Sequence, residues 1–409
     1  MKSILFLLLS MFGMCSIKAG WVVQNTPVTS ALYSINSSHG NVNIAWACGE
    51  NGVILHTTNG GTNWILQSSG TTEDLYAIVF MEISGGPVFA CGENGTMIYT
   101  TNNGLIWNSI NMNTNNALRD ISDFGFIAVG DSGVIFKSTN SGMNWKNIQS
   151  PVNEDLYAVS GSFGYYAVGR SGTVIAGSSQ GQVWSLRNSG FTNDLFGVPL
   201  FGSTDIAVGS GGLIMRSTNS GMNWYAQNSF THRNIRSVEY SVNNTSRIYC
   251  AGDSGLILKT LDWGNNWGSQ ITNTTEDLHS IFFYLDDSRG YACGNNGTIL
   301  RTTDGGGVIT ELSDDISEIP ESNILSQNYP NPFNPVTVIN YEIPQTFDEY
   351  VSLKVFDILG NEVAVLVNEN QKAGSYSVEF DGGNFSSGVY FYKLNAGGYS
   401  EVKKMTLLK

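Results

Sequence analysis

A short glycine turn recurs seven times along this 409-residue chain, at intervals of 38 to 43 residues. Each copy has the form Gly-x-x-Gly, lies between two short apolar runs, and is followed by a polar hairpin. A period near 40 residues with strand-like content is typical of one four-stranded blade of a β-propeller. The turns are CGENG at Gly49–Gly52, CGENG at Gly92–Gly95, VGDSG at Gly130–Gly133, VGRSG at Gly169–Gly172, VGSGG at Gly209–Gly212, AGDSG at Gly252–Gly255 and CGNNG at Gly294–Gly297.

The hairpin that follows each turn has its own pattern, exemplified by TTNGGTNW at Thr57–Trp64. Its Asn or Asp can accept hydrogen bonds from backbone amides, its Gly can adopt a positive φ, and its Trp supplies a large apolar contact. The copy at 177–184 is degenerate, and the copy at 302–309 lacks the Trp. We assign a structural role in these turns to Asn59, Gly61, Trp64, Asn102, Gly104, Trp107, Asn140, Gly142, Trp145, Asn219, Gly221, Trp224, Asp262, Gly264, Trp267, Asp304 and Gly306.

The position of one further tryptophan predicts how the ring closes. Trp21 precedes Trp64 by 43 residues, one repeat length, whereas the last repeat has Ile309 in place of a Trp. We therefore predict that residues 21–27 supply the outer strand of the last blade and pair near Thr298–Thr303. Such an exchange removes the open sheet edges that would invite aggregation.

These residues resemble known repeats. The hairpin resembles the aspartate box of sialidase-type repeats, although Asn59, Asn102, Asn140 and Asn219 replace the acid that Asp262 and Asp304 retain. The whole unit is similar to the propellers of the photosystem II assembly/stability factor family over roughly residues 21–306. The resemblance implies the propeller fold, and it suggests assembly of a photosynthetic membrane complex as one possible role.

The remaining segments predict an exported protein. Residues 1–19 match a secretory signal peptide, with Lys2, an apolar stretch from Ile4 to Met14 and cleavage after Ala19. We assign residues 20–308 to the propeller and the acidic residues 309–323 to a linker. No other segment is apolar for long enough to form a transmembrane helix in the mature chain. The net charge of −14 argues against a nucleic-acid partner.

The last segment, residues 324–409, predicts a small β-sandwich of the immunoglobulin-like kind. After SQNYPNPFNP come strands expected at 336–343, 351–356, 362–367, 375–380, 388–394 and 401–407. The entry PNPFNP, VFDILGNEV, SGVYFYKL and the basic end KKMTLLK closely resemble the type A sorting domain of the type IX secretion system. The resemblance implies that residues 324–409 contact that machinery and that the chain is secreted or attached to the outer surface of a Gram-negative cell. An unrelated adhesive sandwich is the alternative.

Two sets of residues that suggest other chemistry fit the repeat instead. Cys48, Cys91, Cys250 and Cys293 form an even set in an exported chain, but they occupy slots that other copies fill with Val or Ala. We expect buried thiols rather than disulfides. GDSG at Gly130 and Gly252 looks like a serine-protease loop, yet it occupies the slot of GENG and GNNG.

Nothing in the sequence singles out a catalytic residue. A sialidase needs clustered arginines, whereas the arginines here fall at unrelated repeat slots: Arg119, Arg170, Arg187, Arg216, Arg236 and Arg301. Glycosidases also need two carboxylates at a defined separation, and no pair is evident. We predict a non-enzymatic protein without a cofactor. An extracellular, sialidase-like glycan hydrolase is the alternative.

The most distinctive polar feature is a set of carboxylates that the repeat places on one face, because the glycine turns and the loops between blades share that face. This candidate rim consists of Glu50, Glu93, Asp131 and Asp253 in the turns, and Glu73, Asp74, Glu154, Asp155, Asp194, Glu276 and Asp277 in the loops. It could attract a cationic partner or Ca²⁺. Alternatively, each loop Asp caps its own turn and the rest only provide solubility. The sequence thus predicts a binding scaffold whose propeller face holds an unidentified protein or glycan ligand.

Overall fold

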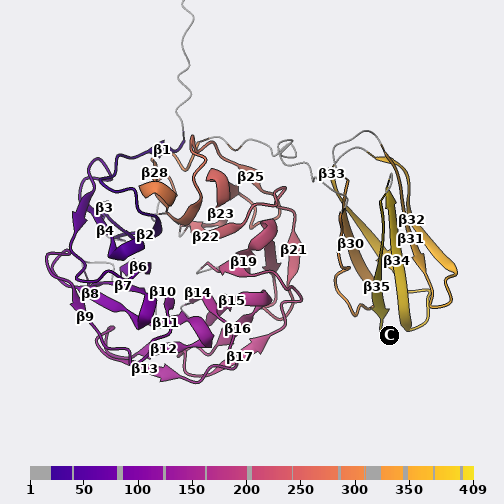
Figure 1. Cartoon of the computed structure of the whole chain (residues 1–409), viewed down its shortest axis with the longest axis horizontal. Helices are drawn as coiled ribbons and strands as arrows, with labels where there is room; N and C mark the ends of the chain where they lie inside the picture. The colour runs from indigo at the N-terminus through magenta and orange to yellow at the C-terminus, as the bar shows by residue number, and fades with distance from the viewer. Residues whose placement is uncertain are drawn as a thin grey trace, which may run out of the picture.

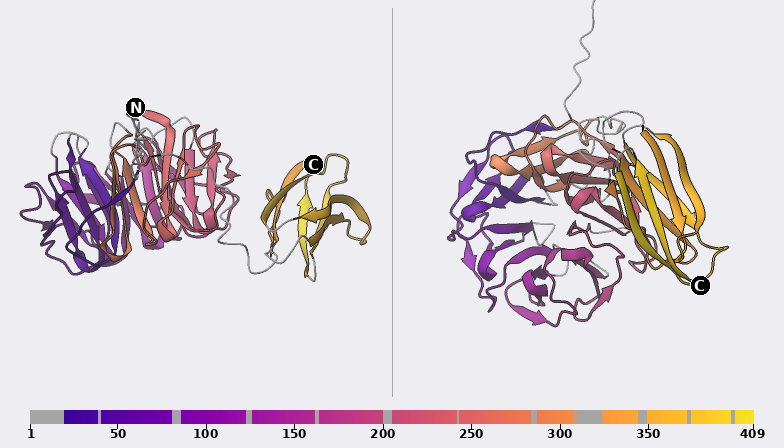
Figure 2. Two further views of the ribbon diagram at one scale, coloured as in Figure 1. Left: turned by 90° about the horizontal axis from the view of Figure 1, so that it is seen from above. Right: turned by 45° about the vertical axis from the view of Figure 1, so that its right-hand side comes forward.

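The protein is all-β, and its strands form a ring of blades with a separate sandwich beside it (Figures 1 and 2). The computed structural model describes residues 20–38, 41–80, 86–122, 126–161, 164–199, 205–241, 243–283, 287–307, 309, 324–343, 349–371, 374–396 and 399–409. The expected signal peptide and, apart from residue 309, the expected linker lie outside these residues. None of the described segments forms a helix with the length and apolar character needed to cross a bilayer.

Seven four-stranded antiparallel sheets make up the ring, as the glycine-turn period predicted. In each blade the first strand lies at the centre of the ring and the fourth at its outer edge (Figure 1). The blades are β2 (Leu32–Ser38), β3 (Asn41–Gly49), β4 (Ile54–Thr57), β5 (Ile65–Gln67); β6 (Leu75–Phe80), β7 (Val88–Gly92), β8 (Met97–Thr100), β9 (Asn108–Ser109); β10 (Leu118–Ser122), β11 (Ile127–Gly130), β12 (Ile135–Ser138), β13 (Trp145–Ile148); β14 (Leu156–Gly161), β15 (Tyr165–Gly169), β16 (Val174–Gly177), β17 (Trp184–Arg187); β18 (Leu195–Gly197), β19 (Asp205–Gly209), β20 (Ile214–Ser217), β21 (Tyr225–Gln227); β22 (Ile235–Ser241), β23 (Asn244–Gly252), β24 (Ile257–Thr260), β25 (Gly268–Ser269); and β26 (Leu278–Phe283), β27 (Gly290–Gly294), β28 (Ile299–Thr302) with β1 (Val22–Val23).

The N-terminal strand closes the ring, and this confirms the prediction made from Trp21. Val22 pairs with Arg301 and Val23 with Leu300, so β1 is the outer strand of the seventh blade. The amide of Gln24 extends the pairing by donating to the carbonyl of Ile299 at 2.8 Å. Trp21 is fully buried, and its indole Nε1 donates to Oε1 of Gln270 in the sixth blade at 3.0 Å. The two ends of the propeller sequence are therefore locked together.

Each glycine turn forms one turn of 3-10 helix between the second and third strands of its blade. Both glycines are required by close backbone contacts, as the first copy shows. A Cβ at Gly49 would lie 1.9 Å from the carbonyl oxygen of Ala31, and one at Gly52, whose φ is +71°, would lie 2.2 Å from that of Thr71 in the next blade's loop. The turns are η1 (Glu50–Gly52), η2 (Glu93–Gly95), η3 (Asp131–Gly133), η4 (Arg170–Gly172), η5 (Ser210–Gly212), η6 (Asp253–Gly255) and η7 (Asn295–Gly297).

The hydrophobic core of the ring lies between adjacent blades. One cluster joins Leu32 and Ala47 of the first blade to Cys293 and Ile299 of the seventh, and similar clusters fill the other junctions. The four described cysteines are free and buried, and the thiol of Cys48 lies 3.3 Å from the carbonyl oxygen of Leu75 in the next blade. They therefore serve as small core residues, as their repeat slots indicated.

The hairpins show the hydrogen bonds expected of the aspartate-box pattern. In the first copy, Oδ1 of Asn59 accepts from the amide of Asn63 at 3.0 Å, and Oγ1 of Thr57 accepts from the amide of Gly61 at 3.0 Å. The same pair of contacts holds the hairpins of Asn102, Asn140, Asn219 and Asp262. In the last copy, the amide of Gly306 donates to Thr302, whose hydroxyl contacts Asp304.

The tryptophans that follow connect neighbouring blades. Trp64 packs edge-on against Tyr291 of the seventh blade, with ring centroids 6.0 Å apart. Trp107 packs in the same way against Trp46 of the first blade at 5.8 Å. These two contacts join a hairpin to the preceding blade.

The C-terminal segment forms two sheets packed face to face. One has the order β29–β30–β33, and the other has the order β32–β31–β34–β35. Their shared core includes Tyr392, Leu394, Val355 and Phe333, all buried. Six strands agree with the predicted ones to within a few residues: β30 (Val336–Ile343), β31 (Glu349–Phe356), β32 (Glu362–Gln371), β33 (Gly374–Asp381), β34 (Gly388–Ala396) and β35 (Tyr399–Leu407). The short β29 (Ile324–Leu325) was not predicted.

A buried histidine makes the first blade sensitive to acid. The ring of His56 stacks on Trp46 with centroids 3.7 Å apart, and its Nδ1 lies 3.3 Å from Nε2 of Gln67. Burial lowers the pKa of His56 from 6.5 to about 4. Between these two values the unfolded chain binds a proton at this site that the folded chain does not bind, so folding stability falls as the pH falls through that window.

We expect Trp21→Ala to lower the free energy of unfolding by about 3–5 kcal/mol, because it leaves a cavity at the point of ring closure. Val22→Ala is the matched control, since Val22 lies on the same strand but is 53% exposed. Its expected cost is below about 1 kcal/mol. Denaturant unfolding of both variants checks this. Equal losses would show that Trp21 does not anchor the closing strand.

We also expect His56→Phe, which preserves stacking on Trp46, to reduce the decrease in folding stability that occurs when the pH is lowered. Melting temperatures of the wild type and the variant, measured from pH 7 to pH 4, provide the comparison. The melting temperature of the wild type should fall further than that of the variant as the pH falls, because only the wild type gains the proton on unfolding. Parallel curves would contradict the role assigned to His56.

Candidate binding site at the channel mouth

The glycine turns and the loops that join successive blades lie on one face of the ring, as predicted. The amide of Asn51 in η1 donates to Oδ1 of Asp74, in the loop that leads to the second blade, at 2.8 Å. Asp155, Asp194 and Asp277 accept in the same way from the preceding turn. Each of these carboxylates therefore caps the turn of the preceding blade, which corrects the expectation that it caps its own.

The carboxylates of the turns themselves also have partners within their blades. Asp131 accepts two hydrogen bonds from Arg119, at 2.7 and 2.9 Å, and Asp253 accepts one from Arg236 at 2.5 Å. Glu93 accepts from the hydroxyl of Tyr76 at 3.0 Å. Glu50 accepts more weakly, from the amide of Ala31 at 3.3 Å. The rim therefore consists largely of carboxylates that hold neighbouring groups, which the sequence alone could not show.

The other rim residues differ in their degree of engagement. Glu73 and Glu276 accept from the side-chain amides of Asn94 and Asn296, at 2.7 and 2.8 Å. Glu154 is exposed and accepts from the adjacent amide of Asn153. Within the described ranges, no three His, Cys, Asp or Glu side chains gather so that they could hold a metal ion.

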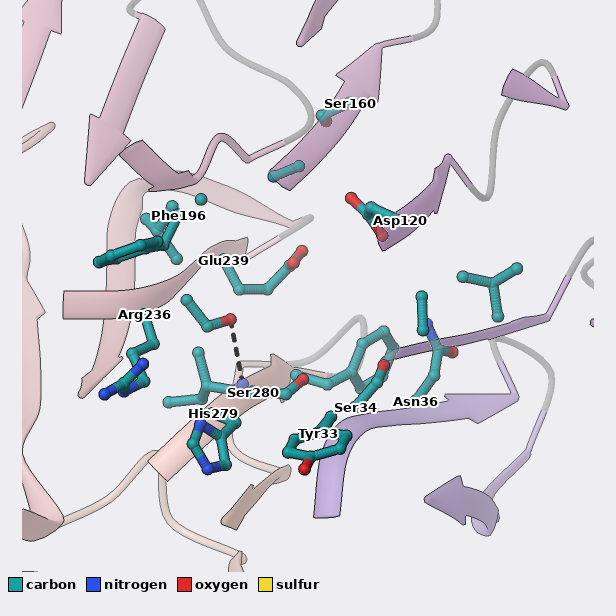
Figure 3. A pocket seen from close by; sticks show the side chains of 18 of the residues that line it. Tyr33, Ser34, Asn36, Asp120, Ser160, Phe196, Arg236, Glu239, His279 and Ser280 are labelled. Atoms are coloured by element: carbon teal, nitrogen blue, oxygen red, sulfur yellow. Dashed lines mark hydrogen bonds between the residues drawn. The ribbon is translucent and has the colours of Figure 1, made fainter. Parts of the chain in front are cut away.

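A cavity of about 370 Å³ runs along the axis of the ring, and we call it the channel. It is lined by the innermost strands of all seven blades, β2, β6, β10, β14, β18, β22 and β26. Figure 3 shows side chains from several of these strands around it. A cavity of this size is in the range of small-ligand or side-chain binding sites.

The mouth of the channel is surrounded by aromatic and cationic side chains that come from one slot of the repeat. Each follows the buried Leu or Ile that begins the innermost strand, and each is partly exposed. We call this set the collar. It consists of Tyr33, Tyr76, Arg119, Tyr157, Phe196, Arg236 and His279.

The collar side chains contact one another around the mouth. Tyr33 lies 5.5 Å, between ring centroids, from both Tyr76 and His279. The guanidinium of Arg119 lies 4.4 Å from the centroid of Tyr76. Tyr157 and Phe196 are 5.9 Å apart. The ring contacts form two aromatic groups, His279–Tyr33–Tyr76 and Tyr157–Phe196, and the two arginines lie between them.

Burial, more than neighbouring charge, sets the protonation states of Tyr33 and His279 in the collar. Burial, with smaller contributions from Asp74, Glu50 and Glu93, raises the pKa of Tyr33, so its hydroxyl stays protonated. Burial also lowers the pKa of His279, whose Nε2 lies 2.8 Å from Oδ1 of Asn295. His279 is therefore neutral near pH 7, and the positive charges of the collar belong to the two arginines.

The residue after each collar residue lies deeper in the channel, and in several blades its side chain is hydrogen-bonded to the backbone of a neighbouring blade. The hydroxyl of Ser34 accepts from the amide of Ile78 at 3.2 Å, and that of Ser280 accepts from Ile35 at 3.3 Å. Asp120 takes the same place in the third blade, and its Oδ2 accepts from the amide of Val159 at 2.8 Å. These polar groups therefore stabilise the wall, which leaves the collar as the main surface offered to a ligand.

The collar was missed from the sequence for an identifiable reason. The sequence analysis places Arg119 and Arg236 at unrelated repeat slots. The structure shows that this assignment is wrong, because both occupy the collar slot after Leu118 and Ile235. Aligning the seven copies on that buried residue would have revealed the set.

Comparisons with known proteins agree with this architecture. The family model for the photosynthesis system II assembly factor YCF48 matches residues 15–303. The model for the secretion system C-terminal sorting domain matches residues 327–407. No curated protein matches the chain.

Solved structures resemble the ring closely in fold but not in sequence. YCF48 bound to D1 peptide is 19% identical with a TM-score of 0.59, and the match covers 69% of this chain and 97% of that one. YCF48 from Cyanidioschyzon merolae is 18% identical with a TM-score of 0.57, covering 69% and 99%. U3-55K is 9% identical with a TM-score of 0.57, covering 70% and 99%.

At these identities the structures show the fold alone, whereas the family model spans well over half of the sequence. The ring, the collar slot and the repeat all lie within that span. The protein therefore belongs to the YCF48 family of photosynthesis system II assembly factors, and it carries a secretion sorting domain at its C-terminus.

Proposed function

We propose that the protein is a non-enzymatic binding propeller of the cell exterior, whose collar holds an extended peptide segment of a partner protein. The observation that carries the proposal is the collar itself, a partly exposed aromatic surface around an axial channel. Aromatic faces supply large contact area with little loss of side-chain freedom. A fold neighbour was solved with a peptide, which supports this ligand class for the propeller.

Charge favours a basic side chain in that segment. Arg119 and Arg236 already pair with Asp131 and Asp253. Glu50 and Glu93 add two more carboxylates on the same face, where they contact the amide of Ala31 and the hydroxyl of Tyr76. The face is therefore negative overall, while the tyrosine rings present faces that attract cations. A Lys or Arg side chain directed into the collar would satisfy both features.

The same geometry argues against hydrolysis in the channel. Oδ1 of Asp120 accepts from the amide of Ile121, and Oδ2 accepts from Val159, both at 2.8 Å. Both oxygens of Asp120 are therefore engaged in holding the backbone of the channel wall. The sialidase-like alternative from the sequence gains no support from this residue.

Location follows from the sorting domain. The matched domain makes the protein a secreted one, and we propose that the type IX machinery of a Gram-negative cell carries it to the outer surface or beyond. A role on a photosynthetic membrane, which the family name suggests, fits less well with such an export signal. The peptide partner would then belong to the cell surface or to another secreted protein.

We expect peptides selected from a random library on the full-length protein to be enriched in Lys or Arg next to an apolar residue. Calorimetry should show that Tyr33→Leu weakens binding of a selected peptide about tenfold, because it removes an aromatic face. Tyr225→Leu, on the exposed outer strand, is the control and should have no effect. Binding should also weaken with added salt.

Three results would contradict this proposal. Enrichment of acidic peptides would contradict the inferred charge preference. Binding on a glycan array without any peptide binding would assign the collar to sugars, and release of free sugar would establish the hydrolase instead.

We expect deletion of residues 324–409 to retain the propeller inside the cell. Fractionation of an expressing strain that has the secretion system should place the full chain outside and the truncated chain in the periplasm. The truncated chain should still bind the selected peptide. Equal export of both chains would contradict the assigned role of the C-terminal domain.

A further inference from the structure

The sorting domain contacts the propeller wall through one side chain of its entry segment. The backbone of Tyr329 belongs to the sandwich, because its amide and carbonyl both bond to Val338 at 2.8 Å. Its side chain points away from the sandwich and stacks on Phe191 of the propeller, with centroids 4.7 Å apart and planes 29° from parallel. The hydroxyl lies 3.1 Å from the carbonyl oxygen of Ser189 and 3.4 Å from that of Trp224.

The receiving surface combines two blades, and we call it the notch. Ser189, Gly190 and Phe191 lie in the loop from β17 of the fourth blade to β18 of the fifth. Trp224 precedes β21, the outer strand of the fifth blade, and is itself buried. The notch thus offers an aromatic face and two carbonyl acceptors, a combination that suits a phenol. Burial raises the pKa of Tyr329, which keeps its hydroxyl protonated as a donor.

Gly190 forms the floor of the notch and leaves no room for a side chain. A Cβ built there would lie 1.9 Å from the hydroxyl oxygen of Tyr329. The equivalent position in other loops is occupied by a side chain, for example by Asn113, Phe230 and Asn273, all with positive φ. Gly70 is a second glycine at this position, but Thr71 follows it instead of an aromatic residue.

Gly70 therefore provides an internal comparison. Its φ is +79° and that of Gly190 is +78°, yet nothing lies within 4 Å of a Cβ built at Gly70. Both loops keep the preceding serine hydroxyl on the following carbonyl, from Ser69 to Thr71 and from Ser189 to Phe191. The two loops are thus alike in backbone and differ in the aromatic face and in the occupant.

We propose that the notch is a docking site for Tyr329, and that it holds the sorting domain against the junction of the fourth and fifth blades. Figures 1 and 2 show the sandwich beside this part of the ring, near β21. Because the notch requires two adjacent folded blades, the position of the sorting domain depends on a correctly folded propeller. This inference concerns the outer wall and is independent of the ligand proposed for the collar.

The test compares full-length variants by small-angle X-ray scattering and hydrogen exchange. Gly190→Ala and Tyr329→Ala should both increase the radius of gyration and the maximum dimension, because the sandwich detaches. Both should also speed exchange at the amide of Phe191. Gly70→Ala carries the same backbone strain and should scatter like the wild type. Tyr329→Phe keeps the stacking and should lower the ratio of docked to undocked molecules between about twofold and tenfold.

Each outcome decides the matter. Unchanged scattering in both Gly190→Ala and Tyr329→Ala would show that the notch does not hold the sorting domain in solution. Expansion in Gly70→Ala as well would attribute the effect to backbone strain rather than to Tyr329. Because Tyr329→Ala leaves the propeller sequence intact, its result stands even if Gly190→Ala unfolds.

Discussion

The structure depends on the contact that each blade makes with the next at the glycine turn. A buried Leu or Ile begins every innermost strand, and the preceding loop closes over the turn of the neighbouring blade. Where that loop carries Asp, as at Asp74 and Asp194, its carboxylate accepts the turn's amide across the junction. No blade could bury its apolar faces alone, so these junctions and the closing strand β1 stabilise the ring as a whole.

The carboxylates of the acidic rim also have a structural role, because they hold collar side chains in place. Asp131 and Asp253 orient Arg119 and Arg236, and Glu93 orients Tyr76. The carboxylates thus fix the collar and at the same time make the face negative. A binding surface built in this way is rigid before the ligand arrives, which limits the entropy lost on association.

The two domains of the chain have separate roles in recognition. The propeller offers its collar to an external partner, and the sandwich carries the features of a sorting signal. Tyr329 lies where they meet, with its backbone in one domain and its ring on the other. The collar opens on the axis, whereas the notch lies on the outer wall, so both surfaces can be occupied together.

The sequence by itself determined the number of blades, the closing strand and the strands of the sandwich. The near-40-residue spacing of the glycine turns and the position of Trp21 one repeat before Trp64 are patterns along the chain, so they can be read from the sequence. The partners of the rim could not be determined in this way. Asp74 reaches the turn of the preceding blade, and Arg119 of the third blade lies over the ring of Tyr76 of the second. Both contacts cross a junction, so they depend on how the blades pack. The docking of Tyr329 at Gly190 joins residues 139 positions apart, and only the tertiary structure brings them together.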